Sequence, residues 1–260
     1  MFQRILYALL LMPILASAQE PASSPTGDLA SVVNVPNTAG TAPVGSPFQS
    51  GILSLKGERP AEAVGYLTRE LAEHPQNGKA WYYRGVCHAN LGEWNEAKAD
   101  FDRALELMPG DANTLLRRSE AHIQNKSYDA AMLDLQAVLR AHQAGPVAEH
   151  ALMACGEVRM RLGDHAGAIA TYDRFITIAP NDARSWFNRG IARAQNNDHQ
   201  GACDDLSKAI QLDGWMHRAY TSRAIELVHL ERKAEACADL TKAKELGDDS
   251  ADDLRAIYCE

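Results

Sequence analysis

The sequence contains none of the short motifs that mark common catalytic sites. It has no GxSxG, no HExxH, no P-loop and no glycine-rich dinucleotide turn. Positive charge is in the minority, with 26 Lys and Arg against 34 Asp and Glu, and the formal net charge is −8. Nucleic acids and anionic membranes attract basic surfaces, so this composition does not favour either as a partner. We therefore expect no enzyme, no cofactor and no nucleic-acid partner.

The sequence also lacks a hydrophobic run long enough to span a membrane. Its most apolar segment, residues 5–16, has twelve residues and contains Pro13, whereas a membrane-spanning helix needs about 20. Arg4 precedes this segment and the small residues Ala16-Ser17-Ala18 follow it, as in a secretory signal peptide. We expect residues 1–18 to be removed, which takes away only Arg4 and changes the net charge from −8 to −9. The mature protein is then periplasmic or secreted, without an integral membrane span; a membrane anchor is the alternative.

Residues 19–43 lack a periodic apolar pattern. They are rich in Pro, Ser and Gly, and such composition is typical of chains that cannot bury a core. We expect a flexible leader.

A helix–turn–helix pattern fills the 34 residues 78–111. Residues that share one face of the first expected helix are Trp81, Gly85 and His88. After a turn at Gly92, those on the face of the second are Ala97, Phe101 and Ala104. Pro109 then ends the unit.

The same landmarks recur in units that begin at residues 112, 149, 183 and 217. The fourth residue of each unit is large: Trp81, Leu115, Leu152, Trp186 and Tyr220. The eighth is small: Gly85, Ser119, Gly156, Gly190 and Ala224. The twentieth is alanine: Ala97, Ala131, Ala168, Ala202 and Ala236. The twenty-fourth is large again: Phe101, Leu135, Tyr172, Leu206 and Leu240. This pattern resembles the tetratricopeptide repeat, whose period is also 34 residues.

The resemblance implies an all-α, right-handed superhelical solenoid of about six helical hairpins. We expect the array at residues 44–250, with repeats 44–77, 78–111, 112–148, 149–182, 183–216 and 217–250, and a capping helix at 251–260. Repeat 44–77 is degenerate, with a short first helix and one extra residue in its turn, as expected for the end of a solenoid. Three additional residues before residue 149, with Gly145-Pro146, predict a loop there.

One polar pattern also follows the repeat. The seventh residue is Arg84, Arg118, Arg189 and Arg223 in four units, and the twenty-third residue of the same units is Asp100, Asp134, Asp205 and Asp239. The unit that starts at residue 149 lacks both, with Cys155 and Thr171. This indicates an Arg–Asp pair between the two helices of each hairpin, because the guanidinium fork matches a carboxylate; a pattern that arises from duplication of the unit alone and a functional row of cations are the alternatives.

Five cysteines, an odd number, leave at least one thiol free. If the last two helices form an antiparallel hairpin, Cys237 and Cys259 lie at the same level and can form a disulfide; five free thiols are the alternative. Cys87 and Cys155 are expected to be small buried residues. The nine histidines follow the repeat, for example His88 and His122 in the same slot, so we expect no metal site.

Tetratricopeptide arrays hold peptides or proteins on a concave surface lined by first helices, and the resemblance implies such a groove here. The residues expected in it are Lys79, Tyr82, Leu116, Met153, Arg184, Phe187, Asn188 and Arg218. Of these, Arg184, Asn188 and Arg218 resemble part of the carboxylate clamp of some family members, although Ile191 occupies the slot of a further clamp Asn. Glu120 and Glu157 are the only acidic pair expected on this surface in adjacent units, with no nucleophile beside them.

We therefore expect a noncatalytic scaffold that binds a protein or peptide in the cell envelope. The alternative is a structural subunit of an envelope or secretion assembly.

Overall fold

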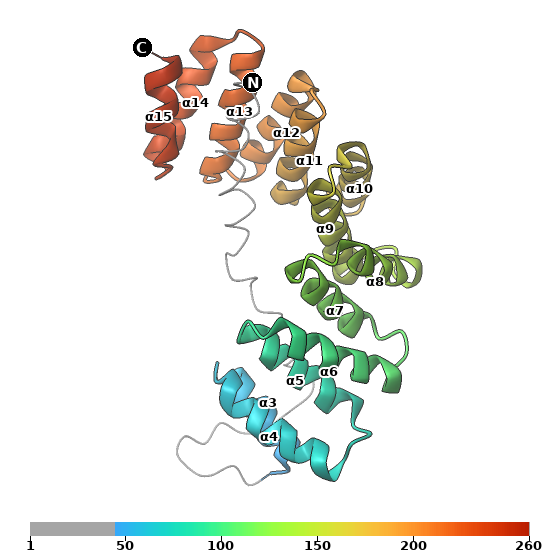
Figure 1. The fold of residues 1–260 in the computed structure, drawn as a ribbon. Coiled ribbons are helices and arrows are strands. Elements are labelled where there is room, and N and C mark those ends of the chain that lie inside the picture. Colours follow the sequence, from blue (N-terminus) through green and yellow to red (C-terminus); the bar gives the residue numbers. More distant parts are fainter. Residues whose placement is uncertain (1–44, 260) are drawn as a thin grey trace.

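The computed structural model describes residues 45–259, so the expected signal peptide and leader lie outside the described residues. This part of the chain contains thirteen helices and no strands. The helices are α3 (Pro47–Lys56), α4 (Pro60–Glu73), α5 (Gly78–Asn90), α6 (Trp94–Leu107), α7 (Ala112–Gln124), α8 (Tyr128–Ala141), α9 (Pro146–Arg161), α10 (His165–Ile178), α11 (Ala183–Gln195), α12 (His199–Leu212), α13 (His217–His229), α14 (Lys233–Glu245) and α15 (Ser250–Tyr258). Figure 1 shows them stacked one after another along a curved array. The all-α solenoid expected from the sequence is confirmed.

Six helix pairs, from α3–α4 to α13–α14, form hairpins with turns of three residues. The middle residue of every turn has a positive φ: Glu58, Gly92, Lys126, Gly163, Asn197 and Glu231. This left-handed conformation reverses the chain within three residues, and it favours glycine because a Cβ atom is strained there. The turn between α3 and α4 also has three residues, so the expectation of an extra residue in it was wrong.

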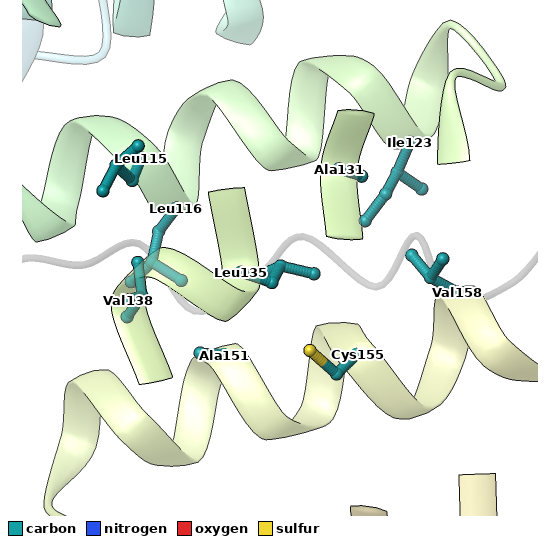
Figure 2. Close-up of a cluster of buried hydrophobic side chains, with 9 residues drawn as sticks. All are labelled: Leu115, Leu116, Ile123, Ala131, Leu135, Val138, Ala151, Cys155 and Val158. Carbon is teal, nitrogen blue, oxygen red and sulfur yellow. The ribbon is translucent and has the colours of Figure 1, made fainter. Parts of the chain in front are cut away.

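The hairpins are held closed by the small and large residues that recur in the sequence. The five alanines of the twentieth slot are fully buried, and Phe101 is 0% exposed. A Cβ atom added at Gly85 would lie only 2.7 Å from the ring of Phe101, so the small eighth residue makes room for the large one. Figure 2 shows the same arrangement further along, where Leu135 of α8 lies between side chains of α7 and α9. Each hairpin thus supplies one wall of its neighbour's core.

The helices form two layers. First helices contact the first helix of the next hairpin, as α5 contacts α7 and α7 contacts α9, and each second helix packs between two first helices. Because a curved stack brings its elements closest together on the inner side, the first helices form the inner layer and the second helices form the outer one. The residues expected in the groove are therefore to be sought on the inner layer.

The additional residues before residue 149 do not all form a loop. Helix α9 begins at Pro146 and has 16 residues, whereas α5, α7, α11 and α13 have 13 each. Gly145, with φ 84°, ends the connection, and proline is favoured at the first turn of a helix because its missing N–H needs no partner there. The expectation that the Gly145-Pro146 pair lies within a loop was therefore half wrong, because Pro146 starts the helix.

The array ends with α15, which packs on α14. A disulfide joins Cys237 of α14 to Cys259, with their Cα atoms 5.7 Å apart, and this is the pair singled out from the sequence. The remaining cysteines, Cys87, Cys155 and Cys203, are free and buried. The disulfide therefore fixes the C-terminal helix to the last hairpin.

Candidate binding surface

The eight residues expected in the groove all lie on first helices of the inner layer. Lys79 and Arg184 are exposed, and four others are half-buried: Tyr82, Met153, Asn188 and Arg218. Leu116 and Phe187 are only 6% and 9% exposed, because they belong to the cores between hairpins. These two side chains therefore offer a ligand little surface.

Two contacts between residues expected in the groove bridge successive first helices. The amide Nδ2 of Asn188 donates to the sulfur of Met153 over 3.0 Å, which links α11 to α9. The guanidinium of Arg218 lies 5.8 Å from the centre of the Phe187 ring, which links α13 to α11. The structure thus brings four of the expected residues together in pairs.

Arg184 is held by its own helix terminus. Its guanidinium donates to the carboxylate of Asp182 over 2.7 Å, and the same carboxylate accepts from the backbone N–H of Arg184 and Ser185. The hydrogen bond to Asp182 raises the pKa of Arg184. Although burial acts in the opposite direction, these hydrogen bonds hold the pKa of Asp182 below its usual value. A ligand carboxylate would therefore compete with Asp182 for Arg184, and each of the three clamp-like residues is engaged with a different neighbour.

Two further arginines of the inner layer, Arg117 and Arg161, were not singled out from the sequence. Arg117 donates to Glu120 over 3.0 Å, and Arg161 donates to Glu157 over 2.6 Å. The two glutamates considered as an acidic pair are thus each paired with an arginine of their own helix. The sequence contained the signal, because Arg117 and Arg161 occupy the sixth and thirteenth slots of their units, which are among the slots expected to line the groove.

His150 lies beside this group. The imidazole of His150 is exposed at the surface, but desolvation by the neighbouring residues lowers its pKa, and the positive charges of Arg117 and Arg184 lower it further. The positive charge of this stretch comes from the arginines.

The expected Arg–Asp pairs are confirmed. They form a ladder between the two layers, in which each Arg–Asp pair is one rung. In each pair Nε and Nη2 of the arginine donate to the two carboxylate oxygens of the aspartate over 2.6–2.8 Å: Arg84–Asp100, Arg118–Asp134, Arg189–Asp205 and Arg223–Asp239. The four aspartates are buried. A bidentate geometry of this kind fixes the angle between the helices of a hairpin as well as their distance.

The remaining nitrogen of each arginine extends the ladder to the preceding hairpin, which the sequence did not reveal. Nη1 donates over 2.6–3.2 Å to a second-helix side chain one hairpin earlier: Thr68, Asp102, Asp173 and Ser207. Trp81 and Trp186 stack under two of these guanidinium groups, at 4.7 and 4.8 Å. Each rung therefore joins three helices.

Within residues 45–259, no group of three or more His, Cys, Asp or Glu side chains is arranged to hold a metal ion. None of the helices in this part of the chain has the length and apolar character needed to cross a bilayer. Neither observation adds a reactive site to the inner surface.

Solved structures with a similar fold are repeat proteins. The C-terminal part of a TPR repeat-containing protein from Cytophaga hutchinsonii superposes with a TM-score of 0.68 at 16% identity, over 76% of this chain and 78% of that one. The APC/C hetero-tetramer Cut9–Hcn1 gives a TM-score of 0.63 at 22% identity, over 82% of this chain and 42% of the other. YrrB, described as a TPR protein with an unusual peptide-binding site, gives 0.58 at 19% identity, over 70% and 93%.

Curated relatives match over short stretches. The human protein SGT1 homolog is 35% identical over 94 residues, which are 36% of this chain and 26% of that protein. The bovine peptidyl-prolyl cis-trans isomerase FKBP4 is 33% identical over 70 residues, which are 27% of this chain and 15% of that protein. The chain thus spans about a quarter or less of the length of these relatives.

Family models for the tetratricopeptide repeat match three overlapping or adjacent stretches, residues 78–111, 116–183 and 157–219. Between them they cover more than half of the chain, and they fall on the hairpins from α5 to α12. The chain is therefore a member of the tetratricopeptide repeat family.

Proposed function

We propose that the protein is a noncatalytic scaffold that binds a protein or peptide partner along its inner layer. The observation that carries this proposal is the mixture of side chains on the first helices, where half-buried Tyr82 and Met153 share the inner layer with positively charged Arg117 and Arg218. Apolar and aromatic anchors next to arginine are the groups that dominate protein–protein recognition. The peptide-binding site described for YrrB supports the same use of the fold.

We also propose that the scaffold works in the cell envelope, as a periplasmic or secreted protein. The signal-peptide pattern of residues 1–18 supports export. The disulfide between Cys237 and Cys259 supports it independently, because structural disulfides persist in oxidising compartments. Fractionation of cells that express the chain with and without residues 1–18 tests this proposal: a protein that stays in the cytosol with these residues present would contradict it.

The binding surface is tested by site-specific photocrosslinking. A photoreactive amino acid replaces Tyr82 on the inner layer or, as the matched control, Leu133 on second helix α8, whose side chain is 68% exposed. We expect a discrete crosslinked partner from position 82 and none from position 133. The reverse result would contradict binding in the groove.

Once the partner is purified, its affinity is measured for Met153→Ala and Arg218→Ala. Each substitution removes an inner-layer anchor, and we expect the Kd to rise about tenfold for each, the effect of losing about 1.4 kcal/mol. Lys208→Ala on α12 is the control, because Lys208 bonds only within its own helix, to Gln211. Equal affinity for the inner-layer variants and the control would exclude the inner layer.

A structural subunit of an envelope or secretion assembly is the second candidate. Five large apolar side chains are exposed outside the first helices: Leu91 and Leu162 in hairpin turns, Leu133 on α8, Trp215 between α12 and α13, and Ile257 on α15. Scattered side chains of this kind are common on protein surfaces, so this candidate depends on finding a partner that covers them. Crosslinking from position 133 together with co-migration in a large complex would favour this candidate.

A further inference from the structure

The Arg–Asp ladder has one gap, in the hairpin α9–α10. Cys155 occupies the arginine slot and Thr171 occupies the aspartate slot. In the other hairpins, Nη1 of the arginine reaches a second-helix residue of the preceding hairpin. For α9–α10 the residue at that position is Gln136. A cysteine is several atoms shorter than an arginine, so the space of a whole rung is left unfilled.

A pocket of about 460 Å³ lies at this gap and is lined by residues of the outer helices α8 and α10 and of the inner helix α9. Its lining includes the three residues of the missing rung, Gln136, Cys155 and Thr171. It also includes three arginines, one from each helix: Arg140 of α8, Arg159 of α9 and Arg174 of α10. No carboxylate lines it. The volume is within the range of small-molecule sites.

The corresponding region one hairpin later contains a buried carboxylate, which this pocket lacks. There Arg193 lies 3.0 Å from the buried carboxylate of Asp205. Its counterpart Arg159 instead donates to the hydroxyl of Thr171 over 2.9 Å and to the carbonyl of Gly167 over 2.6 Å. The carboxylate of Asp164 is 3.9 Å from Arg159. Arg159 is therefore without the buried counter-charge that Arg193 has.

The other two arginines add to this positive charge. Both are exposed to solvent, and within residues 45–259 neither Arg140 nor Arg174 forms an ion pair with a carboxylate. Burial raises the pKa of the Cys155 thiol to about 11, so the thiol is protonated at neutral pH and supplies no negative charge. Three positive charges thus converge on a hollow in a protein whose net charge is negative.

We propose that this pocket binds a carboxylate ligand, which takes the place of the missing aspartate and is held by Arg140, Arg159 and Arg174. The chemistry follows from the next hairpin, where Arg193, the counterpart of Arg159, lies 3.0 Å from the buried carboxylate of Asp205. Three arginines favour a ligand with more than one carboxylate. The ligand is either a free organic polyacid or an acidic segment of a protein. The pocket belongs to the outer layer, so this inference does not depend on the groove.

Isothermal titration calorimetry at low ionic strength tests the proposal with two probes, citrate and a short blocked polyglutamate peptide. We expect saturable binding of at least one of them to the wild-type chain. Arg159→Gln removes one of the gripping groups and is expected to raise the Kd about tenfold. Thr171→Asp places a carboxylate inside the pocket, as Asp205 does for Arg193, and is expected to raise the Kd by at least as much.

The matched control is Arg103→Gln on α6. Arg103 occupies the same slot of its repeat as Arg174, but the neighbouring rung is intact and Arg103 bonds to Glu106. Its Kd for either probe is expected to stay within about twofold of the wild type. Circular dichroism confirms that each variant is folded, and Arg174→Gln replaces Arg159→Gln if the latter is not.

Three results would overturn the proposal. They are no saturable binding of either probe up to about 10 mM, unchanged binding in both pocket variants, or an equal loss in Arg103→Gln. Preference for citrate identifies a free polyacid as the source, and preference for the peptide identifies a protein segment; both results support the carboxylate site.

Discussion

Hairpins α9–α10 and α11–α12 have the same backbone plan but different polar interiors. In α11–α12 the carboxylate of Asp205, 2% exposed, is gripped by Arg189 and approached by Arg193. In α9–α10 neither that arginine nor that aspartate is present, yet Ala168 and Tyr172 are buried as elsewhere. The apolar landmarks are therefore sufficient to form a hairpin. The ion pairs add rigidity and cross-links to a hairpin that the core already specifies.

The largest difference in stability between the two hairpins is expected when the carboxylate of Asp205 is removed. Asp205→Ala leaves Arg189 and Arg193 without their buried partner, and we expect it to lower the free energy of unfolding by about 3 kcal/mol. Thr171→Ala at the same slot of α9–α10 loses only hydroxyl hydrogen bonds and is expected to cost about 1 kcal/mol. Urea unfolding followed by circular dichroism measures both. Equal losses would show that the rung carries no special stability.

A second comparison concerns how closely the two helices of each hairpin approach at the small residue of the eighth slot. A Cβ atom added at Gly156 would lie 2.3–2.7 Å from the ring atoms and hydroxyl of Tyr172, whereas one at Gly190 would lie 3.0 Å from Leu206. We expect Gly156→Ala to cost about 2–3 kcal/mol and Gly190→Ala about 1 kcal/mol, because overpacking forces a rigid ring to move in the first case. Thermal unfolding of the two variants provides the measurement. A larger loss for Gly190→Ala would reverse this ranking.

The turns of the two hairpins offer a smaller contrast. Gly163 has φ 76° and Asn197 has φ 63° at the same turn position. Gly163→Ala places a Cβ atom in the left-handed region and is expected to cost about 1 kcal/mol. Asn197→Gly is expected to change stability by only about 0.5 kcal/mol, because asparagine tolerates this conformation. Urea midpoints test both, and a neutral Gly163→Ala would mean that the turn relaxes.

The smallest effect is a pH dependence of the cross-links between hairpins. Although burial opposes it, hydrogen bonds from Lys98 and Arg118 hold the pKa of Asp102 below its usual value of 3.8. A depressed pKa means that Asp102 stabilises the fold above its unfolded pKa and that this contribution is lost as the pH falls through its folded pKa. Asp102→Gln, which copies Gln136 of the next hairpin, is therefore expected to lower the urea midpoint at pH 6.

The same variant is expected to approach the wild type as the pH falls below the folded pKa of Asp102, because Asp102 is then protonated in both the folded and the unfolded state. If the urea midpoint of Asp102→Gln stays below that of the wild type by the same amount at low pH, the contact depends on the shape of the side chain and not on its charge.

The sequence predicted the hairpins and the Arg–Asp pairs because both repeat with the period of the chain. Comparing the units with one another placed Arg189 opposite Asp205 without any knowledge of the fold. It could not show where the third guanidinium nitrogen points, because that depends on how one hairpin is rotated against the next. It also could not show that Asp182 engages Arg184. Asp182 caps the helix and therefore competes with any ligand for Arg184.

The extra residues before α9 were expected to form a loop because glycine and proline usually mark one. The structure uses them differently: Gly145 makes the bend and Pro146 begins the helix. The pocket at Cys155 was equally hidden, because the sequence shows which side chains are missing from a rung but not whether their neighbours fill the space.

The disulfide at the C-terminal end gives the array a direction. Solenoids fray from their ends, where a hairpin has a neighbour on one side only. The disulfide Cys237–Cys259 holds α15 against the last hairpin. Local opening at this end of the array should therefore be suppressed while the disulfide is intact, and reduction of the disulfide should let α15 separate from α14.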